Sequence, residues 1–180
     1  MVRQSARASV VVGLGLVLAA CAVKGPTTAA AAPNYQAAAP AIATPANLRA
    51  ICYNDADLGT YRARNVQQQL AVGVLACKGA DGQRRLTPQY QAFVEKFGPD
   101  LSTNAAELKT MVARKRLNID VMVTEIANRT AGRPTEDAAF CSRHERAFAW
   151  ALTPEVTSLT QVPSPYDFGP EMKVFPCPKS

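Results

Sequence analysis

Four cysteines in the last 130 or so residues restrict the folds that this chain can adopt. Cys52, Cys77, Cys141 and Cys177 are widely spaced. In an oxidising compartment an even number of cysteines predicts two disulfides, which four residues can form in three pairings. The sequence has no Cys-x-x-Cys, so it lacks a thioredoxin-like redox motif. We therefore expect two structural disulfides within a single domain, since about 130 residues form one compact domain rather than two.

The N-terminus has the pattern of an export signal. Arg3 and Arg7 precede the apolar residues 8–18, a run shorter than the roughly 20 residues that span a bilayer. The sequence Leu18-Ala19-Ala20-Cys21 then resembles the bacterial lipobox. This resemblance implies that residues 1–20 are a lipoprotein signal peptide and that Cys21 becomes the acylated N-terminus. The alternative is an ordinary secretory signal that happens to contain a cysteine.

The residues after Cys21 indicate where the domain is held. Ala22 stands where lipoproteins retained in the inner membrane commonly have Asp, so the resemblance implies the periplasmic face of the outer membrane. Residues 21–47 are rich in Ala, Pro and Thr and nearly uncharged, and repeated prolines interrupt every potential helix. We expect an extended tether here and a domain over residues 48–180.

The charge of the chain gives no reason to expect nucleic acid. The formal net charge is +6, and it falls to +4 when residues 1–20 are removed with their two arginines. This mild basicity in an exported protein predicts no nucleic-acid partner. The run Arg114-Lys115-Arg116 is expected at a solvated helix end, with contact to anionic lipid or polysaccharide as the alternative.

Apolar residues at helical spacing predict an all-α domain, a compact bundle of about five helices. The helix signals include Thr87-Pro88 at a start, Gly98-Pro99 at an end, and the capping-box pair Asn104 and Glu107. The fourth predicted helix, residues 119–132, also has alternating apolar residues, as a strand would. From about residue 153 the chain is expected to be an irregular, proline-rich tail. The five predicted helices cover residues 61–77, 87–97, 104–116, 119–132 and 136–152.

Several phrases of the domain resemble uncharacterised small exported helical proteins of α-proteobacteria. The resemblance extends from about Cys52 to Leu152 and implies an exported helical fold, without an activity to transfer. The phrases are RARNVQQQL, YQAFVEKF, EIANRTAG and AFCSRHERAF.

Helix packing favours one disulfide pairing among the three. Cys77 ends the first predicted helix, and Cys141 lies in the first turns of the last one. If these helices pack antiparallel, the end of one meets the start of the other, which predicts Cys77–Cys141. The same packing brings the start of the first helix near the end of the last, and the tail then returns Cys177 to Cys52.

The sequence offers no constellation that names a reaction. His144 is the only histidine, so a multi-histidine metal site is impossible, and we predict neither a metal nor a cofactor. Ser142 is too near His144 in sequence to face it on a helix. The carboxylates Glu125 and Glu136 are one of many possible pairs for glycoside hydrolysis. No residue is predicted to be catalytic.

The most unusual polar cluster is a predicted helix strip of Arg64, Gln67 and Gln68. Residues at i, i+3 and i+4 share one face, and a guanidinium beside two amides can hold a carboxylate, a glycan or a partner's backbone. The alternative is an ordinary solvated face. Replacing all three residues by Ala should leave melting almost unchanged, because Ala is a good helix former, but should weaken binding of the partner.

Two functions remain from the sequence. The favoured one is a non-enzymatic, lipid-anchored envelope protein that binds or scaffolds a protein partner, for example as a small accessory subunit of a membrane-bound periplasmic complex. The alternative is a carboxylate-dependent enzyme acting on cell-wall or surface polysaccharide.

Overall fold

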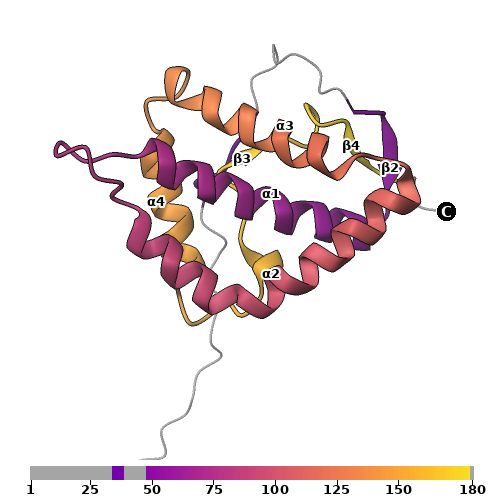
Figure 1. The fold of residues 1–180 in the computed structure, drawn as a ribbon, viewed down its shortest axis with the longest axis horizontal. Helices are drawn as coiled ribbons and strands as arrows, with labels where there is room; N and C mark the ends of the chain where they lie inside the picture. The colour runs from indigo at the N-terminus through magenta and orange to yellow at the C-terminus, as the bar shows by residue number, and fades with distance from the viewer. Residues whose placement is uncertain (1–33, 39–47, 179–180) are drawn as a thin grey trace, which may run out of the picture.

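The structure is a computed structural model that describes residues 34–38 and 48–178 (Figure 1). This part of the chain is mostly helical, as predicted, but it has four α-helices rather than five. Two pairs of very short strands and two 3₁₀ turns complete it. The helices are α1 (Asp55–Ala76), α2 (Thr87–Lys115), α3 (Ile119–Gly132) and α4 (Phe140–Ala151); the strands are β1 (Ala37–Ala38), β2 (Ile51–Tyr53), β3 (Tyr166–Asp167) and β4 (Val174–Pro176); and the 3₁₀ turns are η1 (Arg133–Thr135) and η2 (Leu159–Gln161).

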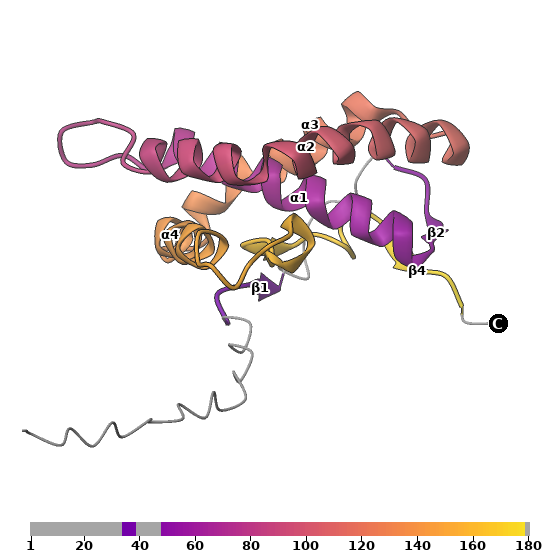
Figure 2. The same cartoon turned by 90° about the horizontal axis from the view of Figure 1, so that it is seen from below.

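Helix α1 is central to the fold. Helices α2 and α3 pack against it, and α4 and the C-terminal segment lie mostly on its other side (Figure 2). Because neighbours surround it, α1 buries Leu58, Tyr61, Val66 and Leu70. The helix begins six residues before its predicted start, since the side chain of Asn54 accepts a 2.8 Å hydrogen bond from the backbone N–H of Asp57.

Helix α2 corrects the prediction of two separate helices around Gly98-Pro99. The helix runs through Pro99 and bends near its middle (Figure 1), as expected where proline lacks an N–H and crowds the preceding turn. Buried side chains lie on both sides of the bend, so one long helix covers more of the core than two short ones. They are Phe93 and Phe97 before it and Leu108, Met111 and Val112 after it.

The predicted cap Asn104 is a buried side chain within α2. Its Nδ2 donates a 2.8 Å hydrogen bond to the backbone oxygen of Thr60 on α1. The Asn104–Glu107 pattern therefore ties two helices together instead of starting one. In contrast, Asn118 caps α3 as predicted, since its Oδ1 accepts from the backbone N–H groups of Asp120 and Val121.

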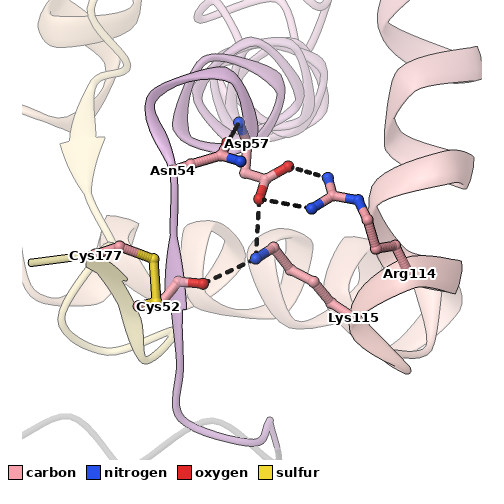
Figure 3. The surroundings of a disulfide bond; sticks show 6 residues. All are labelled: Cys52, Asn54, Asp57, Arg114, Lys115 and Cys177. Carbon is pink, nitrogen blue, oxygen red and sulfur yellow. Dashed lines mark hydrogen bonds and ion pairs between the residues drawn. A yellow bond between two sulfur atoms is a disulfide. The ribbon is translucent and has the colours of Figure 1, made fainter. Parts of the chain in front are cut away.

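Two ion pairs to one buried carboxylate join the start of α1 to the end of α2 (Figure 3). Asp57, only 3% exposed, contacts Arg114 at 2.5 Å and Lys115 at 2.9 Å. The ammonium of Lys115 also donates to the backbone oxygen of Cys52 at 2.8 Å and lies over the ring of Tyr53. The basic run at the end of α2 is thus partly structural, and not solely the solvated end that its sequence suggested.

The C-terminal segment is built into the core rather than being an irregular tail. Strand β4 pairs in parallel with β2, and β3 pairs in parallel with β1. Glu171 is held by ion pairs from Arg129 and Arg133 of the α3–η1 region, and Arg133 lies over the ring of Phe168. The buried apolar side chains of this segment are Val156, Leu159, Val162, Tyr166, Phe168, Met172 and Val174.

Residues 34–38 correct the predicted extent of the tether, because they belong to the folded domain. Tyr35 is fully buried, and its hydroxyl donates a 2.6 Å hydrogen bond to the backbone oxygen of Pro163. Arg143 donates to the backbone oxygen of Tyr35 at 2.9 Å. The predicted signal peptide, the predicted lipidation site Cys21 and the rest of residues 21–47 lie outside the described residues.

The disulfides are Cys77–Cys141 and Cys52–Cys177, the pairing that helix packing favoured. The geometric reason differs in part from the expected one. Helix α4 crosses the C-terminal end of α1 instead of running antiparallel along it (Figures 1 and 2). Cys177 reaches Cys52 because β4 pairs with β2.

The two disulfides indicate a compartment outside the reducing cytoplasm. Within the described ranges, no helix combines the length and the apolar character that a membrane span requires.

Candidate functional site

The predicted polar strip is not a free surface. Arg64 and Gln67 are half-buried where α1 faces α2, and Arg64 donates a 2.8 Å hydrogen bond to the side-chain oxygen of Gln67. Gln67 in turn donates to the hydroxyl of Tyr90 on α2 at 3.4 Å. Burial lowers the pKa of Arg64 from its usual value. Gln68 is also half-buried, so partner binding through this strip remains a prediction, now on a surface with little exposed area.

Next to this strip lies a buried amide network that was not predicted from the sequence. Gln69 is fully buried, and its amide exchanges two 2.9 Å hydrogen bonds with the backbone N–H and oxygen of Tyr166. Its nitrogen also donates to Asn65, which donates to the hydroxyl of Ser164 at 3.1 Å. Gln69 thus satisfies the hydrogen-bonding backbone groups of Tyr166 in β3, as a neighbouring strand would. The i, i+4 spacing of Asn65 and Gln69 was the only sequence signal.

A groove of about 550 Å³ lies between the N-terminal half of α1 and the C-terminal segment (Figure 2 shows both). Its polar lining includes Arg62 and Asn65 from α1, Gln161 from η2 and Asp167 from β3. The preceding part of the chain contributes Gln36. Its apolar lining includes Leu58, Val162, Pro163, Pro170, Val174, Phe175 and Pro176.

Two groups, Arg62 and Phe175, give this groove binding character. The guanidinium of Arg62 has no hydrogen-bond or ion-pair partner among residues 34–38 and 48–178. Phe175 also lines the groove and is 46% exposed, so its ring offers apolar surface to an occupant. Tyr61 also lines the groove, but it is only 2% exposed, and its hydroxyl is buried out of reach of an occupant, with no partner in the described residues. Burial raises the pKa of Tyr61, so this hydroxyl remains protonated.

His144 is a core residue. It is fully buried against Phe140, and its Nδ1 lies 2.8 Å from the backbone oxygen of Phe140, so Nδ1 carries the proton and donates. Burial lowers the pKa of His144, which keeps the ring neutral. Its neighbour Cys141 is in a disulfide. Among residues 34–38 and 48–178, no three His, Cys, Asp or Glu side chains are grouped to hold a metal ion.

The two carboxylates considered for glycoside hydrolysis are both held by arginines. Glu125 pairs with Arg129 at 3.2 Å, and Glu136 pairs with Arg133 at 2.8 Å. The same two arginines hold Glu171, so Glu125 and Glu136 are the ends of one chain of ion pairs that fastens the C-terminal segment to α3 and η1. These ion pairs give Glu125 and Glu136 a structural role.

Comparisons with protein-family models, with curated proteins and with solved structures find no match to this chain. The geometry of the groove is therefore the main guide to function.

Proposed function

We propose that this protein is a lipid-anchored, non-enzymatic module of the bacterial cell envelope that binds a partner protein in the groove beside α1. The observation that carries the proposal is the groove itself, which joins the unpaired cation of Arg62 to the exposed ring of Phe175. A partner segment with a carboxylate and an apolar side chain has complementary chemistry. A small accessory subunit of a periplasmic membrane-bound complex would use such a site.

The walls of the groove favour a polypeptide segment as the occupant. Pro163, Pro170 and Pro176 line it, and proline loses little conformational freedom on binding, so the wall is preorganised. The amides of Gln36 and Gln161 offer donors and acceptors that match a partner's backbone. Exposed aromatic and arginine side chains are the residues that most often dominate the binding energy of protein interfaces.

The proposed anchor is the acyl group of Cys21, followed by a shorter tether than the sequence suggested. Tyr35 is fixed in the domain, fourteen residues after Cys21. Fully extended, fourteen residues reach at most about 50 Å. The groove would therefore stay near the membrane surface, which favours a partner that is itself membrane-bound.

Crosslinking in intact cells, followed by mass spectrometry, tests the proposal. The variant Arg62→Ala with Phe175→Ser should reduce recovery of a reproducible partner at least tenfold. The matched control, Leu75→Ser with Arg84→Ala, also removes an exposed apolar side chain and an arginine, but outside the groove. It should leave recovery unchanged. Equal recovery with both variants would show that the groove is not the binding site.

The anchor is tested separately by labelling cells with a fatty-acid analogue. The native chain should be labelled and Cys21→Ala should not. Equal labelling of both would exclude acylation at Cys21.

A further inference from the structure

The two disulfides differ in how far they are exposed. Cys77 is fully buried and Cys141 is half-buried, whereas Cys52 is exposed and Cys177 is half-buried. Thiol–disulfide exchange requires that a thiolate reach a sulfur atom, and exposed disulfides are the labile ones, which include regulatory and catalytic bonds. In the folded chain, Cys52–Cys177 is therefore the bond that a thiol reagent reaches more easily.

Strand pairing turns Cys52 toward the outer surface, next to an exposed ring. Tyr53, its neighbour in β2, is 1% exposed and points into the core. Because successive side chains of a strand point to opposite faces, Cys52 points outward. Its partner across the β2–β4 pair is Phe175, which is 46% exposed. Paired residues of neighbouring strands point to the same face, so a protein that docks on the ring of Phe175 also reaches the disulfide.

Positive charge lies next to Cys52. The ammonium of Lys115 donates to the backbone oxygen of Cys52 at 2.8 Å and pairs with Asp57 at 2.9 Å (Figure 3). Arg114 pairs with the same carboxylate, so two cations share one anion and the cluster is net positive. The side chain of Lys115 is only 13% exposed, so solvent screens its charge weakly. Nearby cations stabilise a thiolate, which favours Cys52 as the leaving group when the bond to Cys177 breaks.

The same bond holds one wall of the groove. Strand β4 has three residues, and all of them, Val174, Phe175 and Pro176, line the groove. The strand is fixed by its pairing with β2, by a 2.9 Å hydrogen bond from the N–H of Cys177 to the backbone oxygen of Tyr53, and by the disulfide that follows it. A two-stranded pair this short is marginal by itself. Breaking the disulfide should therefore free β4 from β2.

We propose that Cys52–Cys177 is a thiol–disulfide exchange site, that its reductant is a dithiol protein docking on Phe175, and that reduction releases β4. A thiolate of the dithiol attacks Sγ of Cys177 and forms a mixed disulfide, while Cys52 leaves as a thiolate. The second thiol of the dithiol then attacks the mixed disulfide and displaces Cys177. The dithiol is oxidised to a disulfide, and its two electrons and two protons pass to the two cysteines. The exchange itself does not rest on the function proposed for the groove, although release of β4 would remove a wall of that groove.

The test is reduction of the oxidised full-length protein in detergent micelles by reduced thioredoxin, a protein dithiol, followed by alkylation and peptide mapping. Cys52 and Cys177 should be alkylated at least tenfold faster than Cys77 and Cys141. Loss of both disulfides at one rate would indicate reduction through global unfolding and would overturn the proposal, as would resistance of both. After selective reduction, hydrogen exchange of the Cys177 amide should rise at least tenfold, because its bond to Tyr53 is lost. Unchanged exchange would show that β4 is not released.

A small dithiol separates docking from the reactivity of the bond. With thioredoxin, Phe175→Ser should slow the selective reduction at least fivefold. With dithiothreitol, which needs no docking surface, the same variant should be reduced as fast as the native protein. Leu75→Ser is the matched control, because it also removes an exposed apolar side chain but outside β4, and it should leave both rates unchanged. A thioredoxin rate that is the same in Phe175→Ser would exclude docking on this ring.

Trapping identifies the sulfur atom that is attacked. Thioredoxin without its second cysteine should remain linked to Cys177, because Cys52 beside Lys115 is the leaving group. A trapped link to Cys52 would contradict this assignment. Arg62→Ala should leave reduction unchanged while it lowers partner recovery, so failure of the groove and failure of the exchange site give different results.

Discussion

Two glycines on α1 allow a quantitative test of how His144 packs. A Cβ atom at Gly73 would lie 2.2 Å from Cδ2 of His144, whereas a Cβ at Gly59 would meet nothing within 4 Å. Both residues are inside the same helix, where replacing Gly by Ala contributes about 1 kcal/mol of stability when there is room for the methyl group. The same substitution is therefore expected to have opposite effects at the two positions.

The expected cost at Gly73 follows from how firmly His144 is held. Its ring is fully buried, packs against Phe140 with ring centroids 4.2 Å apart, and donates to the backbone oxygen of Phe140. Overpacking a core in this way costs about 1 to 3 kcal/mol. Loss of the hydrogen bond adds about 1 kcal/mol. After the gain in helix propensity, Gly73→Ala should lower the free energy of unfolding by about 1 to 3 kcal/mol.

Urea unfolding followed by circular dichroism, without reductant, measures this difference. Gly59→Ala should be about 2 to 4 kcal/mol more stable than Gly73→Ala. Its Tm should also be higher, by roughly 3 to 5 °C for each kcal/mol in a domain of about 130 residues. In a His144→Ala background, Gly73→Ala should no longer destabilise, because the clash is gone. If Gly73→Ala is as stable as Gly59→Ala in the native background, the close packing of His144 on α1 is wrong.

The remaining predictions concern the start of α1 and its polar face. Burial opposes ionisation of Asp57, but Arg114 and Lys115 outweigh it and hold the pKa of this carboxyl below its usual value. The contribution of the Asp57 carboxylate to stability is therefore present at neutral pH and is lost as the pH falls below about 4. In unfolding experiments, Asp57→Asn should be less stable than the native protein at pH 7, and its stability should depend less on acid pH. Replacing Cys52 and Cys177 by Ser opens a loop closed over 125 residues. The chain-entropy model predicts that this lowers the free energy of unfolding by roughly 4 to 5 kcal/mol. Limited proteolysis should then cut the C-terminal segment first, and a native-like cleavage pattern would contradict this prediction. Alanine at Arg64, Gln67 and Gln68 should lower Tm measurably, since the contact with Tyr90 is lost. The sequence predicted an almost unchanged Tm, and that result would contradict the role of this contact.

The helical class follows from local features of the sequence. Asn118 caps α3 as its side chain predicts, because a cap depends on residues two or three positions away. Helix caps and helical spacing involve neighbours along the chain, so the sequence alone reveals them. The even set of cysteines predicted two disulfides, but the Cys77–Cys141 pairing joins residues 64 apart and was favoured by assuming antiparallel packing, whereas α4 crosses the C-terminal end of α1.

The features that form the candidate sites depend instead on contacts between distant residues. Asn104 has the pattern of a helix cap, yet it is buried because α2 continues through Pro99 to cover α1. Tyr35 lies in a sequence typical of a tether, yet its hydroxyl binds the backbone 128 residues further on. Local propensities are worth a fraction of a kcal/mol per residue, whereas burial of a large side chain is worth about 2 kcal/mol. Tertiary packing therefore outweighs the local pattern wherever the two disagree, and the groove and the exposed Cys52–Cys177 bond arise only once α1, α2 and the C-terminal segment are assembled.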